Sequence, residues 1–153
     1  MSRNKRLSIL TAAEVEDLYG VPSFNESYQR FYFMLNDKEL AEISRIRQRK
    51  YRCVAIALLG YFKCKPVLLN PRYKSMQDDL VFIARFHYRD LTFRRFSLKP
   101  DQKSRIYARV LSIVGVSNWN DKRHQPQLVE HLCTCAESWV EPRAVFDAAI
   151  EYL

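Results

Sequence analysis

The stretch RIRQRKYRCVAIALLGYF, residues 45–62, joins two opposite kinds of sequence. Its first eight residues include five arginines or lysines, and its last ten carry no charge. A single helix through the whole stretch would place Arg49 and Arg52 on the same stripe as Ile56, so that one face would be both solvated and buried. We therefore predict a turn within about residues 46–51, followed by a nearly fully buried helix.

The basic run at this turn has two explanations. It is either a solvated charged turn or a contact for an anionic partner, because the N-terminus of the following helix offers unpaired N–H groups and a positive dipole end. We favour contact with a phosphate backbone. The residues predicted to make it are Arg45, Arg47, Arg49, Lys50 and Arg52.

Positive charge is concentrated in the middle of the chain. Of the 153 residues, 25 are Lys or Arg and 17 are Asp or Glu, which gives a formal net charge of +8. Residues 1–50 carry 9 basic and 7 acidic groups, residues 51–110 carry 13 and 4, and residues 111–153 carry 3 and 6. Positive charge concentrated in one segment favours binding to a polyanionic partner, such as nucleic acid or an acidic membrane surface.

The length fits one ordinary domain, or two very small ones of about residues 1–70 and 71–153. No apolar run reaches the roughly 18 residues of a membrane span, and the N-terminus lacks the apolar segment of a signal peptide. We expect a cytoplasmic, nucleoid-associated protein with reduced cysteines. The last apolar-periodic segment, VFDAAIEYL, stops without a cap, which favours a fragment of a longer protein.

Helix signals dominate the chain. Thr11 followed by Glu14, and Asn36 followed by Glu39, form capping boxes that begin short helices. Further helices are predicted between prolines at about 51–63, 75–87, 101–114, 126–139 and 142–153. The fold class is therefore all-α, a bundle of about seven or eight short helices with helix-turn-helix units.

Aromatic residues at helical spacing occupy the segment FNESYQRFYFML, residues 24–35. Such a stripe is typical of the side of a helix that faces the core. The residues predicted to face the core are Phe24, Tyr28, Phe31, Tyr32 and Leu35.

A second basic segment covers residues 89–115. Within its predicted helix, apolar residues such as Ile106 and Val110 form one face, and Arg105 and Arg109 lie on the opposite one. This pattern suits a helix that reads a DNA groove, although a solvated amphipathic helix has the same pattern. The other cations predicted to contact DNA are Lys63, Lys65, Arg72, Lys74, Arg94, Arg95, Lys99 and Lys103.

Nothing in the chain predicts an active site. Asp78 and Asp79 are adjacent and would point different ways on a helix, the three histidines are scattered, and there is no phosphate loop. Cys133 and Cys135 would point about 200° apart on a helix, and no fourth ligand stands at finger-like spacing from His131. We predict no catalytic residue, no metal and no cofactor in this chain.

Several segments resemble the N-terminal region of the Tn-three family of replicative transposases. The similar segments are LSILTAAEVEDLYGVPSF (7–24), RFYFMLNDKELAEI (30–43), IALLGYFK (56–63) and RIYARVLSIVGV (105–116). The chain departs from the family pattern at Cys53, Ala55 and Ala57, and at VGVSNW. The resemblance implies a helical region with helix-turn-helix units, similar to centromere-protein-B-like modules, that recognises the terminal inverted repeats of a transposon. It also implies that the catalytic Asp-Asp-Glu site and its divalent metal lie downstream, outside this chain.

The functional hypothesis is therefore a non-catalytic domain that binds double-stranded DNA at transposon inverted repeats. Its partners would be that DNA and the rest of the transposase chain. A homodimer formed through the parent protein is left open, and no membrane partner is expected. The main alternative is a helical protein-interaction or scaffolding module with an incidental basic surface. A third alternative is an enzyme completed by residues missing from this chain.

Overall fold

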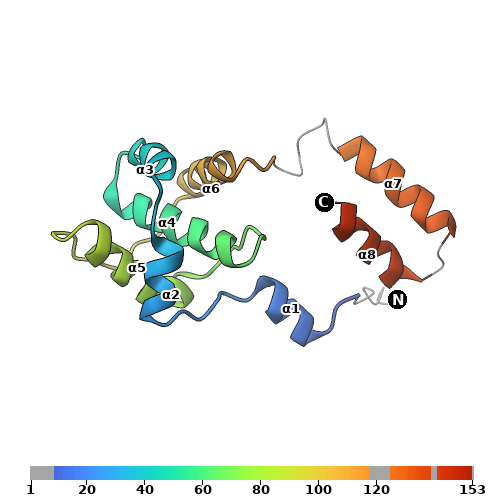
Figure 1. Cartoon of the computed structure of the whole chain (residues 1–153), viewed down its shortest axis with the longest axis horizontal. Coiled ribbons are helices and arrows are strands. Elements are labelled where there is room, and N and C mark those ends of the chain that lie inside the picture. The colour runs from blue at the N-terminus through green and yellow to red at the C-terminus, as the bar shows by residue number, and fades with distance from the viewer. Residues whose placement is uncertain (1–8, 118–124, 139–140, 153) are drawn as a thin grey trace, which may run out of the picture. The chain divides into compact units, whose positions relative to one another are not determined.

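The structure is a computed structural model that describes residues 9–117, 125–138 and 141–152 (Figure 1). Within these ranges every regular element is a helix, which confirms the predicted fold class. The eight described helices are α1 (Ala12–Tyr19), α2 (Glu26–Phe33), α3 (Asp37–Ser44), α4 (Arg49–Cys64), α5 (Tyr73–His87), α6 (Pro100–Val114), α7 (Gln125–Ser138) and α8 (Pro142–Tyr152). Residues 139 and 153, the predicted ends of the last two helices, lie outside the described residues. Among the helices described, none combines the length and apolar character that crossing a bilayer needs.

The contacts divide the chain into two units. We call residues 16–116 the central unit; the terminal unit consists of residues up to 15 and from 117 onward. This division differs from the predicted one near residue 70, because α4 and α5, on either side of that residue, pack against each other. A helix that is apolar on all sides needs covering helices from both directions along the chain.

Helix α4 is the core of the central unit. Every residue from Cys53 to Tyr61 is buried, and α2, α3, α5 and α6 pack around the helix. The predicted turn before it is confirmed, since α3 ends at Ser44 and α4 begins at Arg49. The absence of charge after residue 52 therefore reflects burial on every side.

Helix α2 crosses α4 at Gly60. A Cβ atom added at this glycine would stand 2.4 Å from Cδ1 of Phe33, which is itself fully buried. The predicted core stripe on α2 was wrong in part, because Phe31 is 72% exposed and Tyr28 is 54% exposed. Phe33 occupies the inward side instead, and Phe31 lies two positions earlier, about 200° around the helix.

A buried hydrogen-bond network joins α2, α4 and α5. Asp79 accepts from the Tyr61 hydroxyl at 2.5 Å and from the Gln29 side-chain amide at 2.8 Å. Burial raises the pKa of the Asp79 carboxyl above its ordinary value, and it raises the pKa of the Tyr61 hydroxyl as well. Because each polar group has a partner, the network fixes how the three helices meet.

The terminal unit buries little. Among its described residues, only Leu128 and Ala148 are buried, although α7 and α8 pack against each other. The predicted capping box at the start of α1 is present, and the Glu14 carboxylate also pairs with Arg143 at 2.8 Å. Arg143 makes a second ion pair with Asp147 at 3.0 Å.

Candidate nucleic-acid interface

The corner between α3 and α4, residues 45–52, is held by one of its own arginines. Arg52 donates from Nη2 to the Ser44 carbonyl at 2.8 Å and from Nε to the Ile46 carbonyl at 2.5 Å. These carbonyls lie at the end of α3, where the helix leaves acceptors without intrahelical partners. Arg52 therefore stabilises the turn, and a phosphate contact by this side chain would compete with that structural role.

The other cations of the corner are more available. Arg45 is exposed and pairs with Glu42 of α3 at 3.0 Å. Arg47 and Arg49 are exposed and make no ion pair with any residue that the structure describes. Lys50 is half-buried, and its Nζ lies 5.0 Å from the centroid of the Phe96 ring.

The connection between α5 and α6, residues 88–99, is anchored by aromatic side chains. Phe93 stacks on Tyr73 of α5 at a centroid distance of 6.4 Å, and Phe96 meets the same ring edge-on at 6.1 Å. Both phenylalanines pack against the core. The two residues between them are exposed: Arg94 and Arg95.

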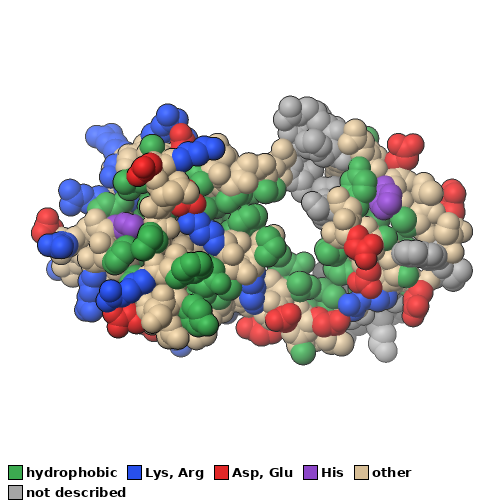
Figure 2. Space-filling view, in the orientation of Figure 1, with side chains coloured by type: hydrophobic (Ala, Val, Ile, Leu, Met, Phe, Trp, Pro, Cys, Tyr) green, Lys and Arg blue, Asp and Glu red, His purple; other side chains and the backbone are tan. Residues whose placement is uncertain are grey.

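The corner and the connection form one surface. The Phe96 ring lies 5.8 Å from the ring of Tyr51, in the first turn of α4, and the Lys50 ammonium lies over the same Phe96 ring. The two segments hold nine cations and one acid, Asp90. Figure 2 shows Lys and Arg side chains gathered over this end of the central unit, at the left of the view. We call this surface the basic end and define it by Arg45, Arg47, Arg49, Lys50, Arg89, Arg94 and Arg95.

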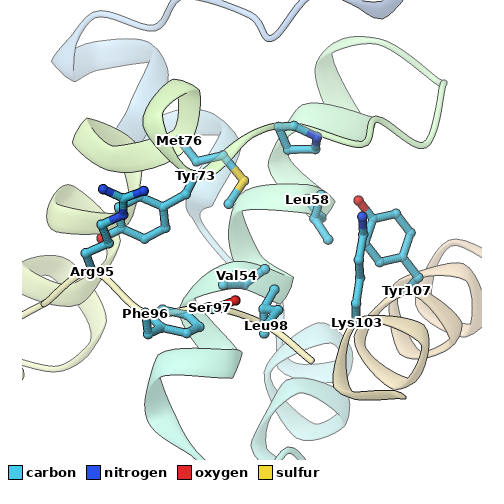
Figure 3. A pocket seen from close by; sticks show the side chains of 11 residues that line it. Val54, Leu58, Tyr73, Met76, Arg95, Phe96, Ser97, Leu98, Lys103 and Tyr107 are labelled. Carbon is cyan, nitrogen blue, oxygen red and sulfur yellow. The ribbon is translucent and has the colours of Figure 1, made fainter. Parts of the chain in front are cut away.

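A pocket of about 460 Å³ opens beside the connection (Figure 3). Phe96 belongs both to this pocket and to the contact with the corner, so the pocket adjoins the basic end. Arg95 and Lys103 lie on opposite sides of it in Figure 3. The Lys103 ammonium donates to Oδ1 of Asn70 at 2.5 Å, a neutral partner that leaves its charge unbalanced.

Three further predicted cations are exposed close to these elements. Arg72 and Lys74 flank Tyr73 at the start of α5, and Lys99 directly precedes α6. Their side chains make no ion pair within the described part of the chain. They extend the positive surface from the connection toward the start of α5.

Helix α6 places its two predicted groove-reading residues differently. Arg105 is exposed and unpaired among the described residues. Arg109 is half-buried, and its Nη1 donates to Oε2 of Glu42 at 2.8 Å, which joins α6 to α3. The predicted pattern placed Arg109 beside Arg105, opposite the apolar face; in the structure α3 packs against α6 and holds Arg109 in this ion pair.

Lys63 and Lys65 lie apart from the basic end. They follow Arg49 by about 15 residues of α4, which corresponds to about 22 Å along the helix axis. Lys63 pairs with Glu39 at 2.9 Å and donates to the Met34 carbonyl at 3.0 Å. Lys65 donates to the Gly20 carbonyl at 3.2 Å. Both lysines therefore stabilise contacts between the end of α4 and segments earlier in the chain.

Two exposed arginines, one of them part of the basic end, were missing from the predicted contact residues. Arg85 lies in the last turn of α5, and Arg89 is the second residue of the connection. The charge balance of residues 51–110 included both, and Arg89 begins the second basic segment, but neither was chosen as a contact residue. Only the turn of the chain after α5 brings Arg89 to the same end as the corner.

Comparison with known proteins identifies a family and nothing closer. A family model described as a domain of unknown function (DUF4158) matches residues 9–153. No curated protein and no solved structure matches the chain. The family match covers both units.

Proposed function

The chain belongs to the DUF4158 family, and we propose that it binds double-stranded DNA through the basic end and recognises the terminal inverted repeats of a transposon during replicative transposition. The resemblance of residues 7–24, 30–43, 56–63 and 105–116 to Tn-three-family transposases supports the choice of DNA and of its site. In this proposal the chain is a non-catalytic part of a transposase, and the parent protein carries the Asp-Asp-Glu site downstream.

One observation carries the proposal. The corner and the connection, which are far apart in sequence, meet through Phe96, and most of the cations that they present make no ion pair with a described acid. Arg47, Arg49 and Arg94 are exposed without an ion pair among the described residues. Arginines held at a rigid corner suit phosphate oxygens, since the guanidinium donates two parallel hydrogen bonds to such groups.

Phosphate contacts and base contacts are assigned to different residues. The basic end would set the register on the duplex through the phosphates, without reading sequence. Arg105 is the better candidate for a base edge, because it is exposed on a helix and free of described ion pairs. Arg109 could join it only by leaving Glu42.

The test is a fluorescence-anisotropy titration of labelled inverted-repeat DNA and of a scrambled duplex, at about 50 mM and about 200 mM salt. We expect tighter binding to the inverted repeat and a steep loss of affinity for both duplexes with salt. Reversing Arg47 and Arg94 to Glu should weaken binding to both duplexes alike and reduce the salt slope by about two. Arg105→Ala should instead reduce the difference in binding free energy between the inverted repeat and the scrambled duplex, by about 1–3 kcal/mol.

A matched control separates the basic end from net charge. Reversing Arg30 and Lys38 to Glu changes the net charge by the same amount, and both side chains are exposed on α2 and α3. Once the effect of the changed net charge on long-range attraction is subtracted, this control should bind both duplexes with the affinity of the natural chain. Equal affinity for both duplexes would refute specific recognition, and an equal loss in the control would refute the assignment of the surface.

A helical protein-interaction module is the second candidate. It is favoured by the exposed apolar side chains of α2 and the residue after it, where Phe31 is 72%, Met34 58% and Tyr28 54% exposed. Aromatic residues and methionine are enriched in protein interfaces. Absence of binding to either duplex at low salt would favour this function.

A further inference from the structure

The pocket beside the connection has an apolar interior and a cationic rim. Val54, Leu58 and Met76 line the interior and are themselves buried in the core. The volume of about 460 Å³ falls within the range of about 300–1,000 Å³ that is typical of small-ligand sites. The pocket is therefore large enough for one ring system.

Aromatic rings and cations limit the kind of ligand. Tyr73 and Phe96 line one side of the pocket and meet edge-on, with an interplanar angle of 78°. Arg95 and Lys103 stand on opposite sides of the opening (Figure 3), and none of the described residues that line it is acidic. A planar group flanked by negative charge on two sides matches this arrangement.

A nucleotide within a DNA strand has that composition. Its base is a planar ring, and the strand places one phosphate before it and one after it. A free mononucleotide carries its phosphate on one side only, so the two separated cations favour the nucleotide of a strand. Stacking on aromatic side chains tolerates any base, because every base has a π face.

We propose that this pocket holds one unstacked nucleotide of a bound DNA strand, with its base against Tyr73 and Phe96 and its two neighbouring phosphates at Arg95 and Lys103. The inference rests on the proposed function, and it adds that one nucleotide of the bound DNA is turned out of the base stack. The protein should prefer DNA in which one nucleotide is already unpaired, because turning out a paired base is costlier.

The test compares three labelled duplexes of equal length, one fully paired, one with a single bulged nucleotide, and one with a bulged abasic site. We expect the 153-residue chain to bind the bulged nucleotide about tenfold more tightly than the abasic bulge. Ser97→Trp should fill the pocket and remove this preference, since Ser97 lies at the pocket and is exposed. Ser97→Ala is the matched control and should keep it, and thermal melting of each variant checks folding.

The outcomes distinguish this inference from the proposed function. Binding to the paired duplex without a preference for the base-bearing bulge would overturn the pocket assignment alone. A preference that survives in a folded Ser97→Trp chain would do the same. Failure to bind any duplex would overturn both proposals. A melting temperature raised by free deoxyadenosine monophosphate, without a bulge preference, would assign the pocket to a free nucleotide and overturn the inference about the strand.

Discussion

The central and terminal units are both built of helices but bury very different amounts of them. Four helices surround α4, and its residues 53–61 are all buried. In the terminal unit, α7 and α8 each bury one residue and leave Val129 49% and Ile150 54% exposed. Two helices that pack only against each other bury one side of each helix and leave the other sides in solvent.

Their ion pairs differ in the same way. The Lys63–Glu39 pair of the central unit is largely shielded, with side chains 29% and 12% exposed. The Arg143–Glu14 pair of the terminal unit is more open, at 43% and 37%. Exposed pairs contribute little to stability because water screens them. The stability of the described structure should therefore reside mainly in the central unit.

Amide hydrogen exchange should show the largest difference between the units. We expect the amides of α4 to exchange about 10³-fold or more slowly than those of α7 and α8, because opening α4 requires unfolding of the whole central unit. Exchange followed by mass spectrometry or NMR on the full chain measures this directly. Similar protection in α4 and α7 would contradict the comparison.

The contact at Gly60 should carry the next largest effect. Gly60→Ala would place a methyl group 2.4 Å from the buried Phe33 ring. Overpacking of this kind costs about 1–3 kcal/mol, and the better helix propensity of Ala offsets part of it. We expect a loss of about 2 kcal/mol in the free energy of unfolding of the central unit, measured by urea denaturation followed by circular dichroism.

Gly115→Ala is the control for this substitution. Gly115 ends α6 with a φ of 71° and has open space around its Cα, so Ala there would meet backbone strain but no neighbour. Its cost should be about 1 kcal/mol. If Gly60→Ala proved milder than Gly115→Ala, α2 would have to be able to move away from α4, and the central unit would be less tightly packed than described.

The sequence predicted those features of the central unit that depend on neighbours along the chain. The corner before α4 followed from the conflict between Arg49, Arg52 and Ile56 on one stripe. The capping box at Asn36 and Glu39 is present with both hydrogen bonds, at 2.9 Å and 3.0 Å. The residues that form such a signal lie within a few positions of one another, so the sequence pattern alone identifies both partners.

Features that depend on distant residues were not predictable in the same way. Arg109 pairs with Glu42, which lies 67 positions away, and no periodicity in α6 identifies that partner. The aromatic stripe of α2 had the right period, but α2 is only eight residues long and its period alone does not show which side α4 covers. The same holds for the candidate interface, because only the packing of Phe96 joins the corner to the connection.

The buried carboxyl of Asp79 should give the smallest effect and a distinct pH dependence. Burial raises its pKa above the ordinary value of 3.8. Between that value and the raised one, the folded chain binds more protons than the unfolded chain, so the contribution of Asp79 to stability falls as pH rises through this window and is constant above it. Asp79→Asn should remove this fall and add a constant loss of about 1 kcal/mol, because an amide keeps only one of the two acceptor oxygens that the carboxylate offers to Gln29 and Tyr61. Urea midpoints measured from about pH 3 to about pH 8 for the natural chain, Asp79→Asn and the exposed control Asp90→Asn would test it. Parallel profiles for the natural chain and Asp79→Asn would mean that the carboxyl titrates alike in the folded and unfolded states, and the network around Tyr61 would then be open to water.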